Sequence, residues 1–79
     1  MSEINRRNVN NGDSGCTTFG PFPADWSERE MIEVLEDHGE CVEPCNGGPG
    51  RYFQHRPMFY RNPGTGGAQF VAISWGYDI

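Results

Sequence analysis

A period of two, typical of a pleated strand, is the clearest apolar pattern in the chain, and it covers residues 68–77. One side of this strand would carry a row of mostly large side chains: Gln69, Val71, Ile73, Trp75 and Tyr77. The segment 51–61 is rich in tyrosine and phenylalanine and lies between two glycine- and proline-rich turn sequences, so it predicts a second strand. Because Pro57 has no amide hydrogen to donate, this strand should lie at a sheet edge or bulge there. The two segments are predicted to pair as a hairpin.

A short helix is predicted over residues 28–38. Ser27 followed by Glu30 is a capping box, in which the serine oxygen accepts from the Glu30 amide and the Glu30 carboxylate accepts from the Ser27 amide. Trp26 and Met31 stand at the two positions of a hydrophobic staple, which fixes how the chain enters the helix. Both signals place the helix start at residue 28.

Gly39 is placed to end this helix in the left-handed conformation. At about 100° per residue, one face of the helix gathers its apolar residues together with a histidine: Met31, Ile32, Val34, Leu35 and His38. The opposite face is acidic and carries Glu30, Glu33, Glu36 and Asp37. The helix is therefore amphipathic.

The N-terminal part of the chain carries weaker signals. Residues 1–15 are polar and almost without apolar anchors, which predicts a flexible, disordered tail. In the proline-broken segment 16–23, Phe19 and Phe22 could dock onto a core as an irregular or edge strand. We predict an α+β fold, with a single small domain over 16–79 in which one amphipathic helix packs on a small antiparallel sheet built around the hairpin. A hairpin alone is marginally stable in water, so the helix, an extra strand or a second subunit must complete it.

Acidic residues are concentrated in one part of the chain. Eight of the eleven lie within residues 25–43, where Arg29 is the only basic residue, so the local charge is −7 while the whole chain carries −5. Like charges three or four residues apart each destabilise a helix by about 0.2–0.5 kcal/mol. Glu36 and Asp37 also lie at the helix end that carries partial negative charge. A sequence shaped for stability alone would contain more basic residues here.

Two interpretations of this acidic face are open. The first is a solvated surface that keeps a small protein soluble. The second is a row of carboxylates that imitates the phosphates of DNA and binds a basic, nucleic-acid-binding surface of a partner, which it would inhibit by competition. The residues predicted to bind that partner are Glu30, Glu33, Glu36, Asp37, Glu40 and Glu43.

The segment 51–61 interleaves three arginines with aromatic residues, a composition typical of platforms for single-stranded nucleic acid. No ribonucleoprotein motif is present, the net charge is −5, and a small domain needs its aromatic residues for the core, so we predict no direct nucleic-acid binding. The alternative function is a small zinc-stabilised nucleic-acid-binding or adaptor module that uses Arg51, Tyr52, His55, Arg56 and Phe59. The arginines could also pair with the acidic helix of a second copy in a homodimer.

Four residues within a short stretch have the chemistry of zinc ligands: His38, Cys41, Cys45 and His55. Their spacing is not that of paired cysteines followed by paired histidines, and a histidine on an apolar helix face is more commonly packed, so we predict no metal and no cofactor. Cys16 makes the cysteine count odd. A disulfide from Cys16 to Cys45, or one between subunits, is an alternative in protein exposed to air.

Signatures of catalysis are missing from the sequence. Neither glycine-rich turn carries the lysine and hydroxyl residue of a P-loop or the G-x-G-x-x-G spacing. No nucleophile is marked beside a base, so we predict that the protein is not an enzyme. No apolar run approaches the ~20 residues of a membrane span, and residues 1–15 lack the apolar stretch of a secretory signal. A cytoplasmic protein is expected.

In its overall character, as a short, acidic, lysine-free chain without an enzyme motif, the sequence resembles phage-encoded anti-CRISPR proteins, in particular inhibitors of type I effector complexes. The resemblance covers the general character of the whole chain. It implies binding to a Cas subunit, often at its basic DNA-binding surface, in the cytoplasm of the host cell. The six acidic residues given above fit that role.

Overall fold

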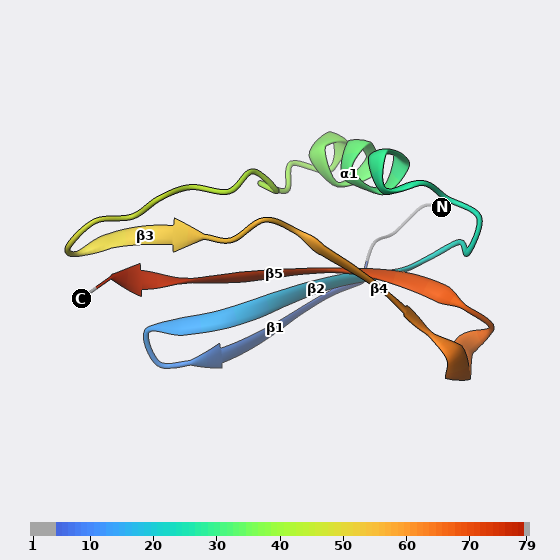
Figure 1. Ribbon diagram of the computed structural model, residues 1–79, viewed down its shortest axis with the longest axis horizontal. Coiled ribbons are helices and arrows are strands. Elements are labelled where there is room, and N and C mark those ends of the chain that lie inside the picture. The colour runs from blue at the N-terminus through green and yellow to red at the C-terminus, as the bar shows by residue number, and fades with distance from the viewer. Residues whose placement is uncertain (1–4, 79) are drawn as a thin grey trace.

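The structure is a computed structural model and describes residues 5–78. These residues form a small α+β domain in which one helix packs with a five-stranded antiparallel sheet (Figure 1). The strands are β1 (Asn5–Asn11), β2 (Ser14–Phe22), β3 (Arg51–Gln54), β4 (Met58–Asn62) and β5 (Ala68–Asp78). The helix is α1 (Glu28–Asp37), and a single 3₁₀ turn, η1 (Pro63–Thr65), connects β4 to β5. The predicted α+β class is confirmed.

The long strand β5 is the centre of the sheet. β2 pairs along one side of it, β3 and β4 pair one after the other along its other side, and β1 lies beyond β2. The predicted strand over 51–61 is thus two shorter strands, interrupted at residues 55–57. Because Pro57 falls in this interruption and both strands lie at the sheet edge, the expectation drawn from its missing amide hydrogen is confirmed.

The N-terminal hairpin differs from the tail predicted over residues 1–15. Residues 5–11 form β1, whose backbone pairs with β2 along its whole length. All seven residues of β1 are exposed, so no apolar pattern marks the strand, and it is held mainly by backbone pairing. Residues 1–4 lie outside the described residues. β2 is an interior strand between β1 and β5 instead of an edge strand, with an irregularity in its register between Phe19 and Phe22.

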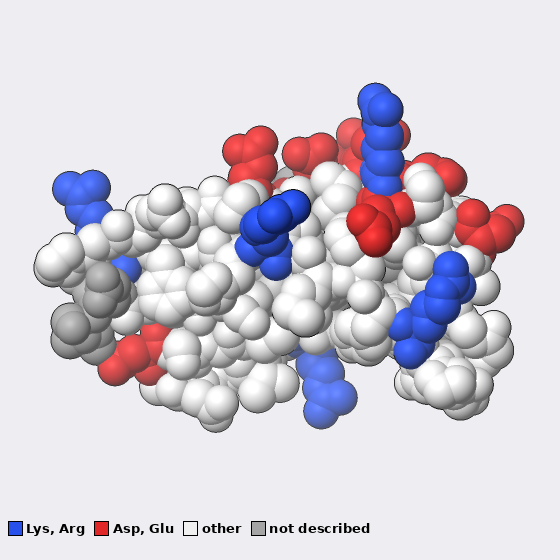
Figure 2. All heavy atoms as spheres, viewed as in Figure 1, with Lys and Arg blue, Asp and Glu red and all other residues white. Residues whose placement is uncertain are grey.

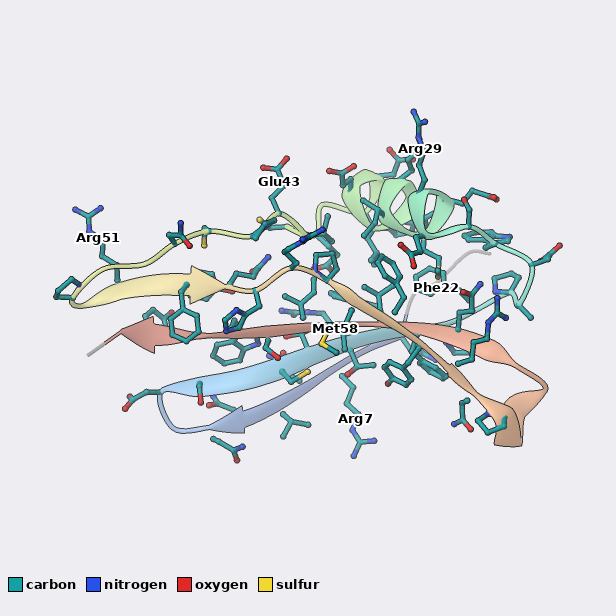
Figure 3. All side chains as sticks on the ribbon, viewed as in Figure 1. Arg7, Phe22, Arg29, Glu43, Arg51 and Met58 are labelled. Atoms are coloured by element: carbon teal, nitrogen blue, oxygen red, sulfur yellow. The ribbon has the colours of Figure 1, made fainter. Side chains whose placement is uncertain are left out.

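The hydrophobic core lies between α1 and one face of the sheet. Its buried members are Phe19, Phe22, Met31, Leu35, Val42, Val71 and Ile73. The two phenylalanines dock onto this core as expected, and alternation along β5 directs Val71 and Ile73 toward the helix. Figure 3 shows Phe22 between α1 and the sheet. Trp26 packs against the same cluster, its ring centroid 5.9 Å from that of Phe22.

Both helix ends have the predicted capping interactions. Ser27 Oγ accepts from the Glu30 amide at 3.2 Å, and the Glu30 carboxylate accepts from the Ser27 amide at 3.2 Å. At the other end Gly39 has a φ of 83°, and its amide and the Glu40 amide each donate at 3.0 Å to carbonyl oxygens of the last turn. This is the Schellman arrangement, in which a residue without a Cβ takes the left-handed position.

The predicted position of His38 on the apolar helix face is corrected. His38 is the C-cap residue, and its side chain is exposed instead of packed among apolar residues. The ring Nδ1 lies 2.9 Å from the carbonyl oxygen of Val34. At the C-cap the chain is leaving the helix, so the helical period no longer determines which way the side chain points.

Candidate functional site

Acidic side chains gather along the helix side of the molecule (Figure 2). We call the six predicted partner-binding residues the acidic ridge: Glu30, Glu33, Glu36, Asp37, Glu40 and Glu43. Five of them are exposed and Glu40 is half-buried. The ridge begins on α1 and continues into the loop that follows it, where Glu40 and Glu43 lie.

Three of these carboxylates already have partners within the chain. Glu30 belongs to the capping box. The Glu33 carboxylate lies 3.2 Å from Arg29 Nε, and the Glu40 carboxylate lies 3.8 Å from Arg6 Nε on β1. Exposed ion pairs of this kind contribute about 0–1 kcal/mol, so they neutralise charge without holding the fold together.

The remaining three members of the ridge are exposed and unpaired within residues 5–78. Glu36, Asp37 and Glu43 form no side-chain hydrogen bond or ion pair there. The last turn of α1 contains no basic residue, so the partial negative charge of the helix end adds to the field of these carboxylates. In Figure 3 Glu43 points away from the sheet, on the same side of the molecule as α1.

The loop that carries the end of the ridge is tied to the sheet by a buried glutamine. The Gln54 side-chain amide donates to the carbonyl oxygens of Cys41 and Glu43, at 3.0 Å each, and its Oε1 accepts from the Tyr52 hydroxyl at 2.6 Å. Backbone bonds between Cys45 and Gln54, at 3.0 and 3.1 Å, add a short bridge beside β3. The loop is therefore positioned by main-chain contacts that leave its acidic side chains exposed.

A shallow groove runs beside the ridge, between α1 and the connection from β3 to β4. Its volume is about 500 Å³, and its lining includes Glu28, Glu33 and Glu36 on one side and Arg56 and Phe59 on the other. Arg56 is exposed and makes no ion pair within the described range 5–78. Arg56 therefore places one positive charge at the edge of the acidic surface, across the groove from α1.

The residues of the alternative nucleic-acid module do not share one surface. Arg51 and Tyr52 are neighbours on β3 and point to opposite faces of the sheet. His55 and Arg56 are exposed in the connection between the strands, whereas Phe59 is half-buried against the core. The structure therefore does not assemble the predicted set.

The cysteines and histidines likewise form no common site. Within residues 5–78 no group of three or more His, Cys, Asp or Glu side chains is close enough to hold a metal ion. Cys16, Cys41 and Cys45 are all free thiols, so the alternative disulfide from Cys16 to Cys45 is not formed. Cys45 Sγ lies 3.9 Å from the Tyr52 carbonyl oxygen. Partial burial, and secondarily the nearby Cys45 and Cys41, raise the pKa of the Tyr52 hydroxyl above its ordinary value.

Sequence reasoning missed a second surface, on the sheet face opposite α1. Arg7 and Val9 of β1 lie there together with Tyr60 of β4 and Phe70 of β5. Alternation along β5 places Phe70 on the face of the sheet opposite to that of Val71, so the sequence could have predicted this one residue of the second surface. The β1 members could not be found, because nothing in a polar segment predicts a strand.

The fold and the acidic ridge together define only a broad class, that of small α+β domains with one strongly charged surface. No protein-family model, curated protein or solved structure matches the chain. No helix in the described part of the chain is long and apolar enough to cross a membrane.

Proposed function

We propose that this protein is a small acidic inhibitor. Through the acidic ridge it binds a basic, normally nucleic-acid-binding surface of a partner, such as a Cas subunit of a type I CRISPR-Cas effector complex. The observation that carries the proposal is the set of exposed carboxylates without a partner within residues 5–78, namely Glu36, Asp37 and Glu43. They extend from the last turn of α1 into the loop that Gln54 holds in place.

The energetics of α1 support a role for these acids outside the fold. An acidic residue at a helix C-terminus destabilises the helix by about 0.3–1 kcal/mol, and α1 has two, Glu36 and Asp37. A basic partner would relieve this repulsion on binding. The unfavourable placement in the free protein then becomes part of the free energy gained in the complex.

The same charge distribution sets the expected kinetics. A dense acidic surface accelerates encounter with a basic partner through long-range attraction, and salt screens that attraction over about 10 Å at 0.1 M ionic strength. Association should therefore slow steeply as salt rises. Duplex DNA should compete for the same basic surface.

The proposal can be tested on a purified type I effector complex by measuring how much labelled target duplex it binds. Wild-type protein is expected to lower the bound fraction. Asp37→Arg should weaken this inhibition by about tenfold or more, since it places like charge against the basic surface. Asp13→Arg is the matched control, because Asp13 is an exposed acid in the turn between β1 and β2, outside the ridge.

Two results would contradict the proposal. Wild-type protein that neither binds the complex nor reduces its DNA binding would remove the Cas subunit as partner. Equal effects of Asp37→Arg and Asp13→Arg would show that net charge alone matters and that the ridge is only a solvated surface. Circular dichroism of both variants checks that the domain remains folded.

A further inference from the structure

The face of the sheet opposite α1 exposes large apolar side chains. Val9 on β1 is 47% exposed, and on β4 Met58 is 66% and Tyr60 is 46% exposed. The strand register places Met58 in one row across this face with Arg7, because Arg7 is opposite Thr18, Thr18 opposite Ala72, and Ala72 opposite Met58. Exposed apolar groups gathered on one face indicate a contact surface.

Tyr60 and Phe70 form an aromatic platform on this face. They are paired across β4 and β5, and their rings are nearly parallel, with centroids 5.4 Å apart and an interplanar angle of 16°. Gly20 of the neighbouring strand β2 lies close to this pair, since an added Cβ there would be 2.7 Å from the Phe70 ring. Because Gly20 has no side chain, the platform borders an open hollow of about 470 Å³.

Among residues 5–78, Arg7 is the only charged residue that lines this hollow. Arg7 is exposed and forms no ion pair or side-chain hydrogen bond within residues 5–78. Its neighbour Arg6 points to the other face of the sheet and pairs with Glu40. Figure 3 shows Arg7 extending away from α1, in the direction opposite to Glu43. The part of the hollow formed by residues 5–78 is therefore basic, although the whole chain carries −5.

We infer that this face binds single-stranded nucleic acid, with a base stacked on the platform of Tyr60 and Phe70 and a backbone phosphate held by Arg7. Stacking of bases on exposed aromatic rings beside a cationic group is the general means of sequence-tolerant single-strand binding. A duplex keeps its bases stacked inside and cannot present them to the rings. Arg7 and Phe70 lie two strands apart, roughly 10 Å, which allows a base and a neighbouring phosphate to be contacted together.

The fold separates the acidic residues of the ridge from this hollow. From the sequence, the net charge of −5 led us to predict no direct nucleic-acid binding. The acidic ridge, however, lies on α1 and the loop that follows it, and no acidic residue among residues 5–78 lines the hollow. Neither the acidic ridge nor its partner takes part in this contact, so nucleic-acid binding here is independent of the proposed inhibition.

The test is fluorescence anisotropy of a labelled oligothymidylate titrated with the protein at low salt. Wild-type protein is expected to bind. Tyr60→Leu keeps apolar bulk but removes the ring, and Arg7→Gln removes the charge, so each should weaken binding by about fivefold or more. The matched controls are Tyr77→Leu and Arg6→Gln, since Tyr77 is an exposed tyrosine on the helix-facing side and Arg6 is the adjacent arginine on that side. Both controls should change the affinity less than about twofold.

Four results would overturn the inference. These are no binding by wild-type protein, equal losses in test and control variants, tighter binding of a duplex of the same length, and a dimer that Tyr60→Leu dissociates. The last would make the face a contact between two copies. Thermal unfolding of each variant separates lost binding from lost folding. Arg7→Gln should leave inhibition of the effector complex unchanged, so the two proposals can fail independently.

Discussion

The side-chain amide of Gln69, in the central strand, donates a hydrogen bond of 2.7 Å to the main-chain oxygen of Trp26, just before α1. The same nitrogen lies 2.9 Å from the carbonyl oxygen of Pro23. Gln69 is 6% exposed and Gln54 is 7% exposed. The Gln54 side-chain amide donates in the same way to the main-chain oxygen of Glu43, in the loop that follows the C-terminal end of α1. Two buried glutamines therefore hold both ends of the segment that carries the acidic ridge.

Replacing Gln69 with methionine should destabilise the domain. Methionine fills a similar volume but cannot donate, so the carbonyl oxygens of Pro23 and Trp26 lose a buried partner. We expect the free energy of unfolding, measured by urea denaturation, to fall by about 1–3 kcal/mol. Ser74→Ala, at an exposed position of the same strand, should change it by less than about 0.5 kcal/mol. Equal losses in the two variants would show that the Gln69 contacts contribute nothing.

The capping box of α1 should contribute measurably to stability. Ser27→Ala removes the side-chain oxygen that accepts from the Glu30 amide, and the expected loss is about 1 kcal/mol. Ser27→Thr retains a hydroxyl and should lose less. Thermal unfolding followed by far-ultraviolet circular dichroism measures both variants. If alanine and threonine are equivalent at this position, the box does not stabilise the helix start.

A side chain at Gly20 should disturb the contact between β2 and β5. An added Cβ would lie 2.7 Å from Phe70 Cδ1 and 2.9 Å from the Gln69 carbonyl oxygen, and the φ of Gly20 is 144°. Gly20→Ala is therefore expected to cost about 1–3 kcal/mol in urea denaturation. Gly48→Ala is the control, because its nearest neighbouring atom would be 3.7 Å away. A loss no larger than that of Gly48→Ala would contradict the close approach.

Tyr52 should ionise at higher pH in the folded protein than in the unfolded chain. Partial burial is the largest cause of the raised pKa, followed by Cys45, Cys41 and Tyr77, and the ordinary value is 10.0. Because the fold favours the neutral hydroxyl, the stabilisation is present below pH 10.0 and is lost as pH rises through the raised pKa.

The measurement for Tyr52 is the difference in tyrosinate absorbance between wild-type protein and Tyr52→Phe. Its midpoint should lie above 10.0 in native protein and return to the ordinary value in urea. Cys45→Ser should lower the native midpoint, since it removes a nearby group that disfavours the phenolate. A native midpoint at or below 10.0 would show that the fold does not raise the pKa of the Tyr52 hydroxyl.

Local signals account for the parts of the fold that the sequence predicted. The start of α1 depends on Ser27 and Glu30, which are three residues apart, and its end depends on the conformation that Gly39 can adopt. The pairing of β4 with β5 follows from alternation and an intervening turn. Each of these features depends on side chains that are close together in the sequence, so one amino-acid sequence is sufficient to predict them.

Contacts between distant residues account for what was missed. β1 has no apolar residue except Val9, and its pairing with β2 is a backbone interaction that any sequence of suitable length can make. The bond from Gln69 to Trp26 joins residues far apart in the chain. Neither leaves a periodic trace in the sequence, because the partner of each group is chosen only when the chain folds.

The sequence by itself determined the capped amphipathic helix, the alternating central strand and the concentration of negative charge within residues 25–43. Tertiary structure alone decided that Arg6 on β1 pairs with Glu40, and that Arg7 faces the opposite side of the sheet. The physical reason is that charge is counted along the chain but acts through space. Pairing of strands separates acidic and basic groups that composition can only add together.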